Sequence, residues 1–108
     1  MRQVRWQPLA LGDVVGAAAW YGLQGGAGLE VAFADALEAA ITRIARNPGI
    51  GSGRYGELLR IEGLRHWPLR KFPHLVFYFD REPHLDVWRV LQSQRDVPAW
   101  MATAQESR

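Results

Sequence analysis

The sequence predicts an α+β domain of two layers, in which an antiparallel helical hairpin packs on a small antiparallel β-sheet. The N-terminal half has two stretches with apolar residues at helical spacing, separated by a glycine-rich segment. The C-terminal half has three short runs that are rich in β-branched and aromatic residues. Neither helix can bury its apolar stripe alone, so we expect the sheet to cover both.

The expected elements begin with a short strand at residues 4–6, which Pro8 ends. A helix follows at residues 9–21, and its apolar stripe is predicted to be buried. The members of this stripe are Leu11, Val14, Val15, Ala18, Ala19 and Gly22. Residues 22–28 contain four glycines and are predicted to form a flexible turn.

The second helix begins near residue 29 and is predicted to end at Asn47, where a Pro-Gly pair follows. Arg43 and Arg46 lie in its last turn, as the helix dipole favours. Apolar residues that share one side predict its buried face: Leu29, Phe33, Leu37, Ala40, Ile41 and Ile44. Residues 50–62 are glycine-rich and are expected to be an irregular link between the layers.

The C-terminal half is expected to form an antiparallel meander with strands at residues 64–69, 75–80 and 85–91. In the last strand, alternation places Leu85, Val87 and Leu91 opposite Trp88 and Val90. Both faces of the sheet are therefore apolar. This leaves two interpretations open, a core that wraps around a sheet edge or an interaction surface.

A chain of 108 residues is expected to form one domain, at residues 1–101, with a short C-terminal turn or helix and a frayed tail at 102–108. The net charge of +2 permits an acidic partner without requiring one. The absence of cysteine fits a cytoplasmic protein. Asp13 interrupts the apolar N-terminal stretch, which is also too short to span a bilayer, so we expect no membrane segment.

The motifs predict no cofactor and no metal site. Residues 51–56 match G-x-G-x-x-G, but a helix is expected before them and no clear helix after them, which is the wrong context for a dinucleotide site. The three histidines, His66, His74 and His84, lack the spacing of a zinc site. We expect them in packing or surface roles.

Arginines in or just after the strands are candidate contacts for an external partner. Arg65, Arg89 and Arg95 have such positions, and the guanidinium fork makes paired hydrogen bonds with phosphate and carboxylate groups. Internal pairing is the alternative for each of them. For Arg65 or Arg95 the candidate carboxylates are those of Asp80, Asp86 and Asp96.

Four blocks carry a further signal through their order and spacing. They are Ala10-x-x-Asp13, then Asn47-Pro48-Gly49-Ile50-Gly51, then Gly63-Leu-Arg65-His-Trp-Pro68 running into Phe72-Pro73-His-Leu-Val-Phe77-Tyr78, and last Trp88-Arg89-Val90-Leu91 followed by Arg95-Asp96. Together they span about residues 4–100. No block is specific alone, but the series resembles the ParE-like branch of the ParE/RelE superfamily of type II toxins.

The resemblance implies a strand, a helical hairpin and an antiparallel sheet, in agreement with the elements above. It implies a cognate antitoxin, ParD-like or of another kind, that wraps the toxin in a hetero-oligomer, and DNA gyrase as the target. The residues expected to bind the target are Arg65, Arg70, Arg89 and Arg95. Those expected to bind the antitoxin, with a plain core role as the alternative, are Trp6, Trp20, Tyr21, Phe33 and Leu37.

Relatives in the RelE-like branch are instead endoribonucleases that cut messenger RNA on the ribosome. They need an acid/base group, often a tyrosine or histidine near the C-terminus, and this chain has neither residue after His84. That favours a gyrase inhibitor that acts by binding, with no catalytic residue. A departure from the ParE-like pattern is Gln92 in the run Leu91–Asp96, where the branch commonly has histidine. A non-toxic interaction module is the third interpretation.

Overall fold

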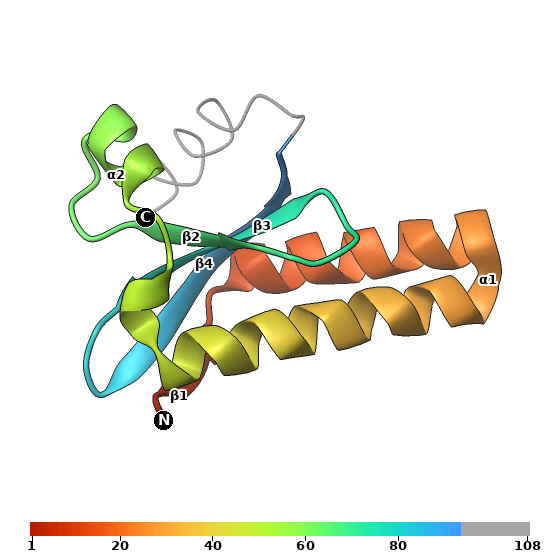
Figure 1. The fold of residues 1–108 in the computed structure, drawn as a ribbon. Coiled ribbons are helices and arrows are strands. Elements are labelled where there is room, and N and C mark those ends of the chain that lie inside the picture. Colours follow the sequence, from red (N-terminus) through yellow and green to blue (C-terminus); the bar gives the residue numbers. More distant parts are fainter. Residues whose placement is uncertain (94–108) are drawn as a thin grey trace.

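A computed structural model of the chain describes residues 1–93. Its α+β class is the predicted one (Figure 1). The elements are, in order, β1 (Gln3–Trp6), α1 (Pro8–Arg46), the 3-10 turn η1 (Pro48–Ile50), α2 (Arg54–Leu59), β2 (Arg65–Pro68), β3 (His74–Asp80) and β4 (His84–Gln92). The expected C-terminal turn or helix, the tail and Arg95 lie outside the described residues. In the described part of the chain, no helix has the length and apolarity needed to cross a bilayer.

The sheet has four strands in the order β1-β4-β3-β2 and is mixed. β2, β3 and β4 form the predicted antiparallel meander, but β1 runs parallel to β4, with Gln3 opposite His84 and Trp6 opposite Val87. The prediction of an entirely antiparallel sheet is therefore wrong at this edge. A strand far from β1 in sequence can pair with it in either direction, because the long connection between them sets no hairpin geometry.

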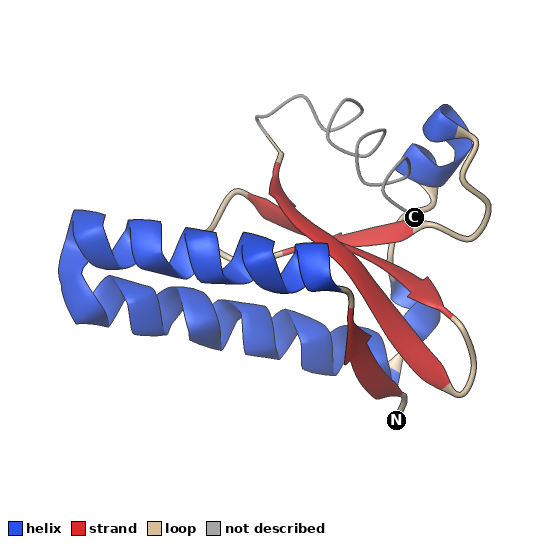
Figure 2. Ribbon diagram, turned by 180° about the vertical axis from the view of Figure 1, so that it is seen from behind, coloured by secondary structure: helices blue, strands red, loops and turns tan. Residues whose placement is uncertain are grey.

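α1 folds back on itself, and its two arms lie side by side along one face of the sheet (Figures 1 and 2). Gly26 is the one residue inside α1 with non-helical backbone angles, with φ 78° and ψ −173°. A positive φ is accessible to glycine at little cost. The predicted turn at residues 22–28 is thus much shorter than expected, and helical backbone continues on both sides of Gly26.

The buried face of the first arm differs from the prediction. Leu11 and Val15 are 49% and 69% exposed, whereas Ala10 and Tyr21 are buried and Val14 packs against the core. Asp13 is the sole charged residue between Pro8 and Gly28, so the apolar pattern extends around this arm and its periodicity does not specify a face. The second arm has charged residues on one side, and its predicted face is confirmed, with Phe33 and Ile44 fully buried.

The two faces of the sheet belong to two separate cores. The helix-side core packs the arms of α1 against Val76, Tyr78, Leu85, Val87 and Val90. The far-side core contains Ile61, Leu64, Phe77, Phe79, Trp88 and Leu91. The second apolar face thus has a local cover, because residues of α2 and of the segment after it pack on it.

A β-bulge in β4 explains why alternation fails for part of that strand. Phe77 lies opposite Arg89 and Tyr78 opposite Val87, so Trp88 is an extra residue. The extra residue reverses the facing of the positions that follow. Val90 therefore joins Val87 in the helix-side core, and Leu91 joins Trp88 on the far side, contrary to the predicted grouping.

The link between the layers is more regular than expected. Residues Arg54–Leu59 form the short helix α2, which ends at Arg60 in a left-handed conformation with φ 57°. Tyr55 and Leu59 contribute to the far-side core from this helix. The many glycines of the segment concealed the helix in the sequence, because glycine has low helix propensity.

Candidate functional site

Arg65 and Tyr78 face each other across β2 and β3, and both bind the segment at residues 48–51. The Arg65 guanidinium donates to the carbonyl of Gly51 at 2.7 Å and to that of Gly49 at 3.4 Å. The Tyr78 hydroxyl donates to the Pro48 carbonyl at 2.7 Å and accepts the Gly51 N–H at 2.9 Å. Burial of the Tyr78 phenol raises its pKa, so the hydroxyl remains protonated at neutral pH.

Close approach explains why glycine occupies position 51. A Cβ on Gly51 would collide with the Tyr78 hydroxyl and would lie 2.9 Å from the His66 carbonyl oxygen. Two of the carboxylates that the sequence offered to Arg65 pair with other arginines, Asp80 with Arg2 at 2.9 Å and Asp86 with Arg81 at 3.7 Å, and the third, Asp96, lies outside the described residues. Arg65 is therefore held by backbone carbonyls, and its side chain is partly exposed.

Arg89 forms a buried ion pair with Asp13. Both nitrogen–oxygen distances of the pair are 2.8 Å, and the side chains are 4% and 13% exposed, respectively. Asp13 also accepts the backbone N–H of Val90 at 3.0 Å. β1 pairs with β4 only as far as Val87. Beyond that point the Asp13 carboxylate, from α1, accepts a backbone hydrogen bond of β4 in place of a neighbouring strand. Of the two alternatives that the sequence leaves open for Arg89, the structure shows internal pairing.

The other two candidate target-binding residues have different positions. Arg70 is exposed in the turn between β2 and β3, beside the exposed Lys71. Arg95 lies outside the described residues. The three arginines that the structure describes have different surroundings, since Arg89 is buried, Arg65 is bonded to carbonyls and Arg70 is exposed on a turn.

Three of the five predicted antitoxin contacts belong to the core. Tyr21, Phe33 and Leu37 are at most 8% exposed. The rings of Tyr21 and Phe33 lie 5.2 Å apart across the fold-back of α1, and both pack edge-on against Phe72. Trp6 is partly buried against the helix-side core. Trp20 is 51% exposed and stacks edge-on against Tyr21.

The outer face of the first arm is apolar and exposed, which the sequence prediction missed. The exposed fractions of Leu11, Val15, Trp20 and Leu23 lie between 49% and 85%. The one charged residue of this arm is Asp13, and its carboxylate points inward to Arg89. Surface helices usually carry charged residues on the side that faces water. An apolar face of this kind indicates an interaction surface.

A second surface feature is a groove between the second arm of α1 and β2, of about 890 Å³. We call it the alanine groove. Its lining includes four alanines on one side of the arm, two aromatic residues and three cations: Ala32, Ala36, Ala39, Ala40, Trp67, Phe72, Arg43, Arg70 and Lys71. Alanines at positions 32, 36, 39 and 40 keep helical spacing, and that signal was present in the sequence.

His66 and His74 lie on opposite faces of the sheet. His66 packs between Tyr55 and Phe77 on the far side of the sheet, whereas His74 packs against Tyr21 and Phe33 on the helix side. Within residues 1–93, no three acidic or histidine side chains are grouped so that they could hold a metal ion.

We predict that His66 makes stability sensitive to mild acid. Burial lowers the pKa of its imidazole, and the charge of Arg54 lowers it further. As the pH falls below the ordinary histidine pKa of 6.5, His66 becomes protonated in the unfolded chain but stays neutral in the folded protein. The free energy of unfolding therefore decreases as the pH falls from 6.5 to the lowered pKa of the folded protein. Urea midpoints at about pH 7.5 and about pH 5.5 should show a larger loss for the wild type than for His66→Gln. Equal losses would show that the acid sensitivity lies elsewhere.

Comparison with known proteins gives a family and a fold. The family model described as the ParE toxin of the type II toxin–antitoxin system parDE matches residues 4–97. A solved structure described as the chromosomal ParDE toxin–antitoxin system from P. aeruginosa superposes with a TM-score of 0.70 at 15% sequence identity, covering 85% of this chain and 96% of that chain. At that identity the superposition shows a shared fold. A search of curated proteins gives no significant match.

Proposed function

The chain belongs to the ParE toxin family of type II toxin–antitoxin systems, and from this we propose that it inhibits DNA gyrase by binding and is neutralised by a cognate antitoxin. The observation that carries the proposal is the extent of the family match, which covers residues 4–97 and so runs from β1 to beyond the end of β4. We place the protein in the cytoplasm, where gyrase and the antitoxin would meet it.

Inhibition by binding is favoured over RNA cleavage by the distribution of acid/base groups. His66 and His74 lie on opposite sides of the sheet, within aromatic clusters. The sequence after His84 contains neither histidine nor tyrosine. A nuclease would need such a group beside its phosphate-binding cations. Cutting of ribosome-bound messenger is the alternative outcome of the tests below.

For the target contact we propose Arg65, Arg70 and Arg95, with Arg89 in a supporting role. Arg70 is exposed and can reach a partner directly. Arg65 is partly exposed and fixes the carbonyls of residues 49 and 51, so it both presents charge and shapes this surface. Arg89 would act through its pairing with Asp13, which joins α1 to β4.

For the antitoxin we propose a contact along the exposed face of the first arm, around Trp20. The core positions of Tyr21, Phe33 and Leu37 would then support the surface from below. Trp6, the last residue of β1, lies just before the arm in the chain and would contact the border of this interface. An interface that covers this face should protect the amide hydrogens of residues 6–37 from exchange, and no added protection there would overturn this placement.

We expect expression of the chain without antitoxin to stop growth and to produce signs of DNA damage, because trapped gyrase leaves broken DNA. Arg70→Ala should weaken this effect while the melting temperature changes little, since Arg70 is exposed. Arg5→Ala is the matched control, because Arg5 is also exposed but lies on β1, at the opposite edge of the sheet. Folded protein that leaves growth unaffected at high expression would indicate a non-toxic interaction module.

A further inference from the structure

The outward side of the first arm of α1 has an unbroken apolar stripe, which we call the first-arm stripe. Its members recur every three or four residues, so they share one side of the helix. They are Leu9, Gly12, Val15, Gly16, Ala19, Trp20 and Leu23. All seven are exposed, and Leu23, at the end next to the fold-back, is 85% exposed. Within residues 1–93 this side of the arm therefore faces solvent.

The two glycines of the stripe are not explained by contacts within the described chain. A Cβ added to Gly12 or Gly16 would meet no side chain and no neighbouring element of residues 1–93 within 4 Å. Glycine inside a helix lowers its stability relative to alanine. Small residues four positions apart, however, allow the backbone of a second helix to approach closely. The spacing Gly12-x-x-x-Gly16, continued by Ala19, therefore indicates contact with a helix of another molecule.

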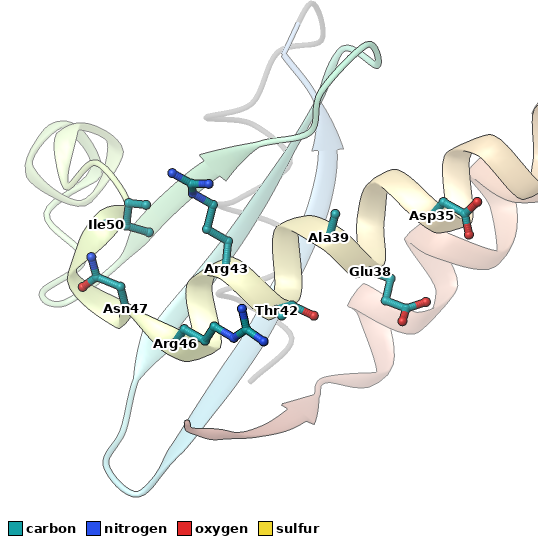
Figure 3. A pocket seen from close by; sticks show the side chains of 8 residues that line it. All are labelled: Asp35, Glu38, Ala39, Thr42, Arg43, Arg46, Asn47 and Ile50. Atoms are coloured by element: carbon teal, nitrogen blue, oxygen red, sulfur yellow. The ribbon is translucent and has the colours of Figure 1, made fainter.

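The first-arm stripe has no charge, whereas the second arm is charged. Asp13 is the sole charged residue of the sequence between residues 8 and 28, and its carboxylate is bonded to the buried Arg89. Figure 3 shows charged side chains along the second arm, which are Asp35, Glu38, Arg43 and Arg46. A second copy of the stripe can therefore approach the first without bringing like charges together.

The first arm is long enough for a weak but specific contact with a second copy. From Pro8 to Gly25, the residue before the fold-back, the helix rises about 26 Å, and half of its circumference is about 18 Å. Two facing arms would therefore bury on the order of 1,000 Å² in total. Interfaces of this size are typically weak and reversible.

We propose that two copies of the chain pair through the first-arm stripe in the absence of an antitoxin, with the two arms antiparallel. In this orientation Leu23 of one protomer packs over Gly12 of its partner, because a small residue on one helix leaves space for a large one on the other. A parallel pair would bring both fold-backs to the same end, together with Glu30, which lies against Gly22 there. Antiparallel arms keep the two carboxylates at opposite ends of the pair.

The proposed antitoxin contact lies on the same side of the arm, around Trp20. The antitoxin and a second copy of the chain would therefore exclude each other, and an antitoxin that covers this side would separate the two protomers. The inference does not depend on the proposed toxicity, because it concerns the chain alone.

Sedimentation equilibrium of the purified full chain, from about 1 to about 200 µM, tests the pairing. We expect a monomer–dimer equilibrium with a dissociation constant on the order of 10 µM. It should persist at high salt, because salt screens contacts between charges and the stripe has none. Val15→Lys should weaken the dimer by about tenfold or more, since it places an unpaired charge in the interface. Leu58→Lys is the matched control, because Leu58 is exposed to a similar extent but lies on α2.

A second variant separates pairing from folding. Gly16→Leu has open space within the described part of the single chain, so its melting temperature should not fall. Its side chain would hold the two backbones apart, and the dimer should weaken by about tenfold or more. A Gly16→Leu variant that pairs as tightly as the wild type would overturn the close approach of the two arms.

Disulfide cross-linking tests the orientation, because the chain contains no cysteine. A mixture of Gly12→Cys and Leu23→Cys proteins should give a cross-linked pair that contains one chain of each. Efficient cross-linking of Leu23→Cys with itself, without the mixed pair, would overturn the antiparallel arrangement.

Three further outcomes would overturn the inference as a whole. They are a wild-type chain that remains monomeric at the highest concentration, a Val15→Lys variant that pairs as tightly as the wild type, and a monomer that binds neutral phospholipid vesicles through the stripe. A monomeric wild type that stops growth would leave the toxin proposal intact. A dimer that affects neither growth nor gyrase would overturn the toxin proposal and leave the pairing.

Discussion

Replacing Arg89 with alanine is expected to lower the free energy of unfolding by about 3–5 kcal/mol. The change would leave the carboxylate of Asp13, 13% exposed, without the guanidinium that bonds both of its oxygens. The whole stability of a small domain is about 5–15 kcal/mol. The loss should therefore appear as a large decrease in the urea midpoint, and any loss of toxicity in this variant would follow from unfolding.

Matched variants distinguish the ion pair from a general effect of losing an arginine. Asp13→Ala should also lower stability strongly, because it removes the carboxylate that pairs with the buried Arg89 and the acceptor of the Val90 N–H. The double variant should cost less than the sum of the two single changes. Arg70→Ala, on an exposed turn, should change stability by less than about 0.5 kcal/mol. A small effect of Arg89→Ala, similar to that of Arg70→Ala, would contradict the buried pair.

The second large effect is expected for Gly51→Ala, at about 1–3 kcal/mol of lost stability. The added methyl group would displace the Tyr78 hydroxyl or move the chain away from β2, and either movement breaks bonds between the sheet and residues 48–51. Arg65 would also lose its 2.7 Å bond to the Gly51 carbonyl, so the shape of the proposed target surface would change along with stability.

A glycine in the same motif provides the control for this prediction. Gly53 has open space around its Cβ position and an ordinary φ of −89°. Gly53→Ala should therefore leave the urea midpoint almost unchanged. Similar stabilities for the two alanine variants would show that residues 48–51 are not held closely against Tyr78. Growth assays of both variants would then show whether this segment contributes to toxicity.

The strands and the second arm of α1 were predictable because the spacing of their apolar residues fits only one type of secondary structure. β3 alternates strictly, so alternation alone puts Phe77 and Phe79 on the face opposite Tyr78, where the structure has them. The second arm has charged residues such as Glu30 and Glu38 on its outer side, so periodicity specifies its buried face. In both cases the residues of the element itself are enough to show which of its sides is buried.

The features that were missed depend on contacts between distant residues. The bulge at Trp88 arises where β4 meets both β3 and the Asp13 carboxylate, and no pattern within β4 marks it. The first arm lacks polar residues that would identify its outer face, so Leu11 and Val15 were assigned to the core. The parallel pairing of β1 with β4 joins the two ends of the described chain and has no local signature.

The sequence predicted which arginines of the candidate site make specific contacts, but not which groups they contact. The sequence identified Arg65 and Arg89 as unusual because they lie in strands, and both proved to make specific polar contacts within the protein. For Arg65 the candidate carboxylates did not include the acceptors found, which are the carbonyls of Gly49 and Gly51. For Arg89 no carboxylate was named, because Asp13 is distant from it in sequence. The alanines that line the groove were not identified from the sequence, because alanine is an ordinary helix former and its position relative to β2 depends on the fold.

The most direct test of the central claim is a supercoiling assay with purified gyrase, relaxed plasmid and the purified chain. We expect the wild-type protein to block supercoiling and to increase the amount of cleaved plasmid, with a weaker effect for Arg70→Ala and an unchanged one for Arg5→Ala. Unimpaired supercoiling at a large excess of folded protein, together with cleavage of ribosome-bound messenger, would contradict the account and assign the chain to the nuclease alternative.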